Sequence, residues 1–286
     1  ELSVKDAVIT AKNGEVTLTA EASDINASSA KLTAKDELTL TAQQSITATD
    51  ANVTSNSLTM TAKTGKLDGS RLTATVADQA SVEAGDSVTL DGSKLGLGAL
   101  TASAKSGDLS LKSAEIEVSG AAELTAQDSI TATDANVTSN SLTMTAEMGS
   151  VEASRLKTNV ADQASIVAGT SVTLDSTKLG AGALTATATT GDLSVKDAEV
   201  TTKTGGVTLT AEAADIDASG VNLTAVGAAT LTAGQDLKLA PSGDAVASVT
   251  AKSLSATAGG ALDASRLQVA VKEASAFRSN GLLTLT

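Results

Sequence analysis

Three of the four arginines share one position in a repeated pattern. Arg71, Arg155 and Arg266 each follow a Gly-Ser or Ala-Ser pair and precede a Leu. A spaced row of guanidinium groups could contact an acidic or sulfated glycan. Alternatively, duplication copied an arginine that caps a turn. The formal net charge of −13 favours the second interpretation, because three cations are few in so acidic a chain.

Aspartate and asparagine recur in the segment TDANVTSNS, which occurs twice and could offer oxygen ligands to calcium. These residues are Asp50, Asn52 and Asn56 in the first copy and Asp134, Asn136 and Asn140 in the second. The segment lacks the Gly-Asp nonapeptide pattern of calcium-binding β-rolls, so turn formation and stacked Asn side chains are the favoured interpretation. We therefore predict no metal site and no cofactor.

Four Asn-x-Ser/Thr sequons could accept a glycan. They begin at Asn26, Asn52, Asn136 and Asn222. Chance matches are expected in a chain this rich in Ser and Thr, so the sequence leaves glycosylation of these residues open.

The sequence offers little to catalysis. It contains no His and no Cys, and none of its carboxylates stands in an apolar cluster that would raise a pKa. The segments Gly96-Leu97-Gly98 and Gly259-Gly260 are expected to be turns rather than phosphate loops, because no Lys-Ser/Thr pair follows them. We predict that the protein is not an enzyme and has no catalytic residues. No ligand-binding residue can be assigned from the sequence.

The composition excludes several other classes. Hydrophobic residues make up 41% of the 286 residues, yet Phe277 is the one aromatic residue, so a core would consist of aliphatic side chains. The acidic charge disfavours nucleic acid and anionic membrane surfaces as partners. No run of 18 apolar residues is present, so we expect no insertion into a membrane.

The chain repeats itself. Residues 40 to 62 recur at 124 to 146 with one change, Gln44 against Asp128. Longer units start near Leu2, Leu109 and Leu193. Comparison of these units indicates an elementary period of about 21 residues, which is typical of a solenoid. We expect a single repeat segment over residues 1 to 286. Because Glu1 falls within a repeat, we expect it to be a fragment of a longer protein.

Within each period, apolar residues alternate with Thr, as in Val16-Thr17-Leu18-Thr19-Ala20. This alternation predicts strands with one buried face and Thr on the other face. Short strands at a fixed period predict an all-β fold, a right-handed parallel β-helix of about 13 coils with about 21 residues per coil. The alternative is an array of antiparallel sandwiches, which the lack of aromatic residues and of Asn-Gly hairpin signals disfavours.

The LTA and LTLTA strands, the Gly107–Leu111 segment GDLSL and the Ala/Thr/Leu/Asp-rich repeat resemble the central repeats of filamentous-haemagglutinin-type exoproteins. These are adhesins and stalks of contact-dependent toxins that Gram-negative bacteria secrete by two-partner systems. The resemblance covers the whole chain. No functional residue can be carried over, because these residues include no counterpart of the family's secretion domain or toxin tip.

The resemblance implies a secreted or cell-surface protein whose partner during secretion is an outer-membrane transporter. We expect the chain to be a structural shaft that spaces or presents the binding region of an adhesin. One alternative is a surface along the shaft that itself binds a host or matrix glycan or protein. A second alternative is the stalk of a contact-dependent growth-inhibition toxin.

Overall fold

A computed structural model describes all residues from Glu1 to Thr286. The chain is all-β, with 38 strands and no helix, and its named strand pairs are parallel, which confirms the predicted parallel β-helix. The structure contains no helix of the length and apolar character that crossing a membrane requires. The chain divides into two compact units, Glu1–Thr143 and Met144–Thr286. The expectation of a single segment stays a prediction.

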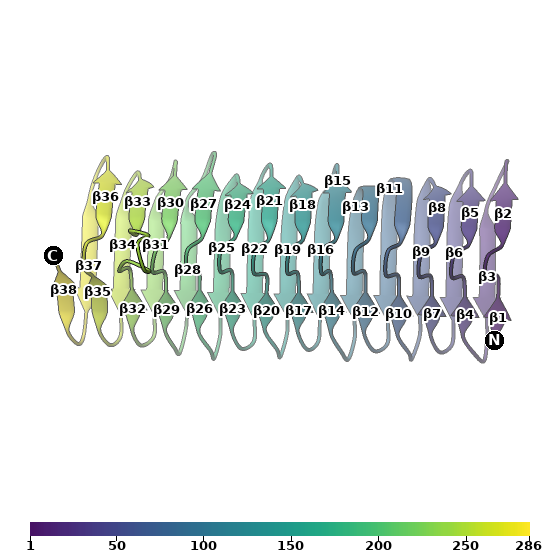
Figure 1. Ribbon diagram of the computed structural model, residues 1–286, viewed down its shortest axis with the longest axis horizontal. Coiled ribbons are helices and arrows are strands. Elements are labelled where there is room, and N and C mark those ends of the chain that lie inside the picture. Colours follow the sequence, from purple (N-terminus) through teal and green to yellow (C-terminus); the bar gives the residue numbers. More distant parts are fainter. The chain divides into compact units, whose positions relative to one another are not determined.

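One turn of the solenoid consists of three strands that face three sides of the core (Figure 1). A two-residue strand such as β4 (Ile25–Asn26) is followed by a four-residue strand, β5 (Lys31–Ala34), and then by a longer one, β6 (Glu37–Ala42). The next turn begins with β7 (Ile46–Thr47), which pairs with β4. Strands therefore stack into three columns in each unit, here named the short, middle and long columns.

In unit 1, the short column contains β1 (Leu2–Ser3), β4, β7, β10 (Leu67–Asp68), β12 (Val88–Thr89), β14 (Leu109–Ser110) and β17 (Ile130–Thr131). The middle column contains β2 (Val8–Ala11), β5, β8 (Asn52–Ser55), β15 (Glu115–Val118) and β18 (Asn136–Ser139). The long column contains β3 (Val16–Ala20), β6, β9 (Ser57–Ala62) and β16 (Ala121–Ala126). Strands β11 (Thr73–Ala84) and β13 (Lys94–Ala104) run through both the middle and the long column.

In unit 2, the short column contains β20 (Val151–Glu152), β23 (Val172–Thr173), β26 (Leu193–Ser194), β29 (Ile216–Asp217), β32 (Leu237–Lys238), β35 (Leu262–Ala264) and β38 (Leu283–Leu285). The middle column contains β21 (Lys157–Val160), β24 (Lys178–Ala181), β27 (Glu199–Thr202), β30 (Asn222–Ala225), β33 (Ser248–Ala251) and β36 (Gln268–Val271). The long column contains β22 (Gln163–Ala168), β25 (Ala183–Ala188), β28 (Val207–Ala211), β31 (Ala229–Ala233), β34 (Leu254–Ala258) and β37 (Ser275–Ser279). The chain passes from unit 1 to unit 2 within β19 (Ser141–Ala146).

The spacing of paired residues confirms the period read from the sequence. In the short column of unit 1, Ile25 pairs with Ile46, Ile46 with Leu67 and Leu67 with Val88, each 21 residues further along the chain. The separation is 23 residues between Leu193 and Ile216 and 25 between Leu237 and Leu262, where the corners take up the extra residues. The short column has seven strands in each unit and therefore about 14 turns in the chain, one more than predicted.

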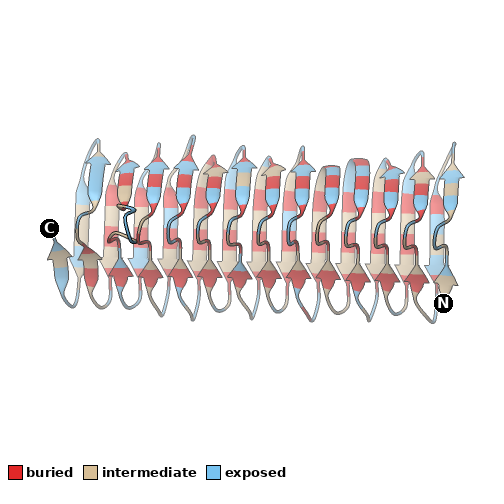
Figure 2. Cartoon of the chain, in the orientation of Figure 1, coloured by how far each residue is buried: buried red, intermediate tan, exposed pale blue.

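The core is an aliphatic stack. Every turn directs one or more Leu, Ile, Val or Met side chains inward, and the short-column residues Ile25, Ile46 and Leu67 are completely buried. Figure 2 shows the buried positions alternating with partly or fully exposed ones along the strands. Small Ala side chains fill many of the remaining inward positions, as Ala42 and Ala62 do. A core without aromatic rings is possible because each turn covers the apolar residues of the next.

Threonine lies on the outer face of the long column, as the alternation predicted. In unit 2, Thr185 pairs with Thr208 and Thr208 with Thr230, so that identical side chains stack on neighbouring strands. The β-branched side chain suits an exposed strand face, and Thr–Thr neighbours stabilise the ladder by roughly 0.2–1 kcal/mol per pair. The repeat of LTLTA and LTATA motifs in the sequence is therefore the consequence of stacking like on like.

The middle column of unit 1 contains a repeated defect. Ser55 and Ser139 point inward, are 6% and 4% exposed, and their hydroxyl groups have no hydrogen-bond partner. At the corresponding position of unit 2, the buried Thr202 hydroxyl instead donates to the Gly205 carbonyl oxygen at 2.8 Å. A buried hydroxyl without a partner lowers stability because it has lost its hydrogen bonds to water.

We therefore expect the substitution Ser55→Ala to increase the free energy of unfolding by about 1 kcal/mol, since it removes a buried orphan hydroxyl and little volume. Urea unfolding followed by circular dichroism measures the change. The control Thr202→Ala removes a hydroxyl that has a partner and should lower the midpoint. A lower midpoint for Ser55→Ala would contradict this account of the core.

Candidate functional site

The corner that follows the short column has one residue in the left-handed conformation in nearly every turn. The φ angles of these residues lie between 54° and 68°. In unit 1 the residues are Asp6, Ser29, Asp50, Arg71, Gly92, Ser113 and Asp134, and in unit 2 they are Arg155, Ser176, Asp197, Gly220, Gly243 and Arg266. All three arginines of the repeated sequence position occupy this conformation, which non-glycine residues adopt at an energetic cost. Their shared position reflects the shape of the corner.

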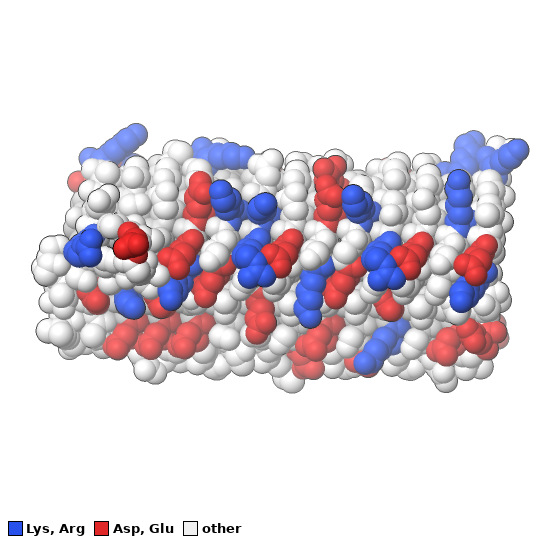
Figure 3. Space-filling view, viewed as in Figure 1, with Lys and Arg blue, Asp and Glu red and all other residues white.

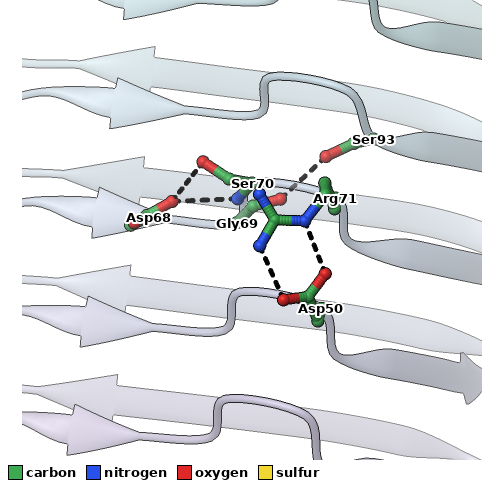
Figure 4. Close-up of polar contacts among 6 residues, drawn as sticks. All are labelled: Asp50, Asp68, Gly69, Ser70, Arg71 and Ser93. Carbon is green, nitrogen blue, oxygen red and sulfur yellow. Dashed lines mark hydrogen bonds and ion pairs between the residues drawn. The ribbon is translucent and has the colours of Figure 1, made fainter.

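Arg71 forms a two-pronged ion pair with the residue one turn before it (Figure 4). Its Nε donates to Asp50 Oδ1 and its Nη2 donates to Asp50 Oδ2, both at 2.6 Å. At the same corner, Asp68 accepts hydrogen bonds from the Ser70 backbone nitrogen at 2.9 Å and from the Ser70 hydroxyl at 2.6 Å. The Ser93 hydroxyl, in the following turn, donates to the Gly69 carbonyl oxygen at 2.7 Å and so links the two turns.

The ion pair has an electrostatic signature. The hydrogen bond from Arg71, together with its positive charge, lowers the pKa of the Asp50 carboxyl group from its ordinary value of 3.8. In return, Asp50 raises the pKa of the Arg71 guanidinium group. The positive charge of Arg71 is thus engaged by a carboxylate, and this arginine does not form the open cationic contact that an acidic glycan would need.

The structure does not bring the arginines together into one basic surface. In unit 2, Arg155 and Arg266 are separated by the corners of Ser176, Asp197, Gly220 and Gly243, which puts them five turns, or about 24 Å, apart. On the face drawn in Figure 3, basic and acidic side chains lie in small adjoining groups. This arrangement favours the interpretation that duplication copied an arginine at a turn.

The repeated Asp and Asn residues are spread along the chain. Asp50 lies at the corner before the middle column, Asn52 begins strand β8, and Asn56 lies at the corner after that strand. Six residues of nearly extended chain place the Asp50 and Asn56 side chains roughly 15–20 Å apart, too far to share one ion. No group of three acidic side chains in the structure could hold a metal ion. Their positions at corners and at the start of a strand favour the interpretation of turn formation and side-chain stacking.

The sequons fall on two kinds of position. Asn52, Asn136 and Asn222 are the exposed first residues of middle-column strands. Asn26 is partly buried in the short column, where its Oδ1 accepts hydrogen bonds from the backbone nitrogen and the hydroxyl of Ser28 at 3.1 and 2.8 Å. Asn26 is therefore the least accessible of the four acceptors, and glycosylation of the others stays an open prediction.

One surface feature of unit 1 was missed by sequence reasoning. The segment Gly96-Leu97-Gly98, which we expected to be a turn, lies inside strand β13, and the α-carbon of Gly96 is on the outer face of the middle column. This prediction was wrong because the Leu-Gly-Leu-Gly spacing continues the strand alternation, with Leu95 and Leu97 buried. The missing side chain leaves a notch of about 220 Å³, lined mainly by Thr73, Thr75, Lys94, Glu115 and Glu117.

Charged groups border this notch. The Lys94 ammonium group lies 3.6 Å from Glu115 Oε2, across the ladder between β13 and β15. Gly96 pairs with Thr75 on one side and with Glu117 on the other. Glu117 is exposed and forms no ion pair, so its carboxylate is available to a ligand. Hydroxyl, ammonium and carboxylate groups therefore surround one patch of exposed backbone.

The backbone does not require glycine at position 96. Its φ angle lies outside the left-handed region. A β-carbon placed there would meet only the Ala74 carbonyl oxygen, at 3.9 Å. Gly98, two residues later, is different: its β-carbon would lie 2.0 Å from the Asp78 carbonyl oxygen, so close packing excludes a side chain. A glycine inside a strand weakens it and often marks a bulge, a bend, or the close approach of a ligand or another backbone.

Unit 2 contains a related notch with other chemistry. The notch over Gly180 in β24 is lined by Thr158, Lys178, Glu199 and Thr201. The Lys178 ammonium group lies 3.4 Å from Glu199 Oε2. Thr201 replaces the free carboxylate of Glu117. In addition, Lys203 Nζ donates to Asn159 Oδ1 at 2.8 Å, between the two strands that flank β24. A β-carbon at Gly180 would lie 3.0 Å from the Thr158 carbonyl oxygen, so glycine has a packing reason here.

No protein-family model matches this chain, and neither the curated proteins nor the solved structures include a match to it.

The Arg71–Asp50 pair predicts a small, pH-dependent contribution to stability. Because the folded protein lowers the pKa of Asp50, the contribution is complete above the unfolded pKa and is lost as pH falls through the lowered value. We expect Arg71→Ala to unfold at a lower urea concentration than the parent at pH 7. The difference should shrink on acidification, and also on addition of salt.

The matched control is Arg266→Ala, which removes an arginine from the same left-handed position without an ion pair. Its effect on the urea midpoint should not follow that pH and salt dependence. A constant difference between Arg71→Ala and the parent from pH 7 to pH 2 would show that the ion pair contributes nothing to folding.

Proposed function

We propose that this chain is a structural shaft segment of a secreted or cell-surface bacterial adhesin, and that it spaces or presents a binding region. The observation that carries the proposal is the stacking of aliphatic residues at 21-residue intervals, seen in Ile25, Ile46 and Leu67. Each turn adds about 4.8 Å along the stack and offers the next turn the same surface. Length is then a matter of the number of turns.

The chemistry of the surface supports this role. The outer face of the long column consists largely of Thr and Ser side chains, and several Lys side chains pair with a carboxylate on an adjacent turn, as Lys94 does with Glu115 and Lys252 with Glu273. A surface of net negative charge resists association between strand edges and favours solubility. The resemblance of its repeats to those of filamentous-haemagglutinin-type exoproteins suggests secretion through a two-partner transporter.

A deletion of one whole turn tests the shaft proposal. Removal of residues 68 to 88 joins Leu67 to Thr89 and keeps all three columns in register, because Leu67 and Val88 occupy equivalent positions. We expect this variant to stay folded, with a urea midpoint close to that of the parent. Removal of residues 68 to 78 puts outward residues into the core, and we expect it to unfold unit 1.

Circular dichroism and limited proteolysis measure both deletions. Equal damage from the two variants would contradict a modular shaft, because half-turn and whole-turn changes would then be equivalent. As a size-matched control, a duplication of residues 68 to 88 should give a folded protein with a larger hydrodynamic radius.

A secretion assay tests the cellular part of the proposal. The chain is fused behind a two-partner secretion domain and expressed with its transporter in a Gram-negative host. We expect the solenoid to reach the cell surface, where added protease degrades it in intact cells. Retention inside the cell, with the secretion domain alone exported normally, would argue against this function.

The second candidate function is that the shaft itself adheres to a glycan. The observation that favours it is the notch over Gly96, where a strand glycine without a packing requirement lies between polar and charged side chains.

A further inference from the structure

We propose that the notch over Gly96 binds one sugar ring of a neutral glycan. This inference rests on the second candidate function, adhesion by the shaft itself, and is independent of the shaft's role as a spacer. It begins from a glycine that reduces the stability of its strand, occupies no left-handed conformation and makes no close backbone contact. The packing explanation fails at this residue, and the register shift between β11 and β13 comes after Leu97, opposite Gly98. The approach of a ligand is a further reason for a glycine inside a strand.

The dimensions of the notch suit a single sugar ring. Thr75 and Glu117 lie on strands two ladder steps apart, about 9.5 Å, and Gly96 lies between them without a side chain. The volume of about 220 Å³ is sufficient for a ring but not for a folded peptide element. The exposed backbone of β13 forms the floor, and the side chains of the flanking strands form the walls.

The mixture of polar groups selects the class of ligand. The Lys94 ammonium group can only donate hydrogen bonds, the Glu117 carboxylate can only accept them, and the Thr73 and Thr75 hydroxyls can do both. Sugar hydroxyl groups also donate and accept, so each finds a partner in this notch. A polyanion would be repelled by the unpaired carboxylate of Glu117. The positive charge of Lys94 is engaged by Glu115, so what the notch offers a ligand is mainly hydrogen-bonding groups, which a neutral polyhydroxyl ligand can satisfy.

A shallow notch without an aromatic side chain for stacking binds weakly, with a dissociation constant on the order of millimolar for a single ring. Many copies of the chain on one cell surface would convert such contacts into avidity for a polysaccharide. Binding should therefore be measured with polymeric ligands, for which many weak contacts act together.

The experiment uses the whole chain immobilised at high density on a biosensor surface. The probes are three neutral polysaccharides, dextran, mannan and galactan, with heparin and poly-lysine as charged comparators. We expect one or more neutral polysaccharides to bind, with little change between 50 and 500 mM salt. Gly96→Thr, which fills the notch, and Glu117→Gln, which removes the charged acceptor, should each weaken that binding about tenfold or more.

Gly96→Thr separates loss of binding from loss of folding. A β-carbon at position 96 meets no atom closer than 3.9 Å, and Thr continues the row of Thr54 and Thr75 on the preceding strands. We therefore expect an equal or higher urea midpoint than the parent. The matched control is Gly180→Ala in the related notch of unit 2, which lacks the free carboxylate. It should leave binding within twofold of the parent.

Three results would overturn the proposal. They are binding of heparin or poly-lysine only, binding of a neutral polysaccharide that Gly96→Thr leaves unchanged, and absence of binding to every probe. None of these results changes the outcome expected in the deletion and secretion experiments. Failure of the glycan site and failure of the shaft proposal are therefore distinguishable.

Discussion

The parallel hydrogen-bond ladder between consecutive turns is the constraint on which this structure depends. It fixes each residue beside its counterpart about 21 positions away, so any change in register would affect all three columns of a turn together. The sequence satisfies this constraint by repetition: Ile25, Ile46 and Leu67 lie in one line, as do Thr185, Thr208 and Thr230. Because each turn shields its neighbours, small aliphatic side chains suffice for a core.

Departures from the 21-residue period show where the ladder tolerates variation. The turn from Leu237 to Leu262 has 25 residues, and its additional residues form the corner around Pro241 and Gly243. There, Ser242 and Ala245 form an isolated bridge and the Ser242 hydroxyl donates to Asp197. The strands on both sides keep their pairing. Corners can therefore accept insertions.

Much of the fold was predictable from the sequence, because the sequence shows both an alternation of period two within strands and a repeat of about 21 residues between turns. The alternation at Val16 to Ala20 predicted both the strand and its exposed threonines. The site was harder to predict. Nothing in the sequence distinguishes Gly96, which leaves an open notch, from Gly98, which the Asp78 carbonyl oxygen requires. That difference depends on the backbone of the neighbouring turn.

The pairing of Arg71 with Asp50 was also beyond sequence reasoning. The two residues are 21 positions apart, so the period allows them to lie on adjacent turns, yet the left-handed corner determines that their side chains meet. Repetition of the arginine at positions 155 and 266 suggested a row of cations, whereas the residues between them at the same corner are Ser, Asp and Gly.

Ser55 and Ser139 show what the duplication of repeats does to the stability of a solenoid. Both belong to copies of one ancestral stretch, and both bury a hydroxyl group with no partner. Duplication of a repeat thus copies its destabilising residues together with its stabilising ones. A longer molecule built in this way contains more turns with a buried, unpaired hydroxyl group. The free energy of local unfolding is then lowest at the least stable turn, however many stable turns surround it.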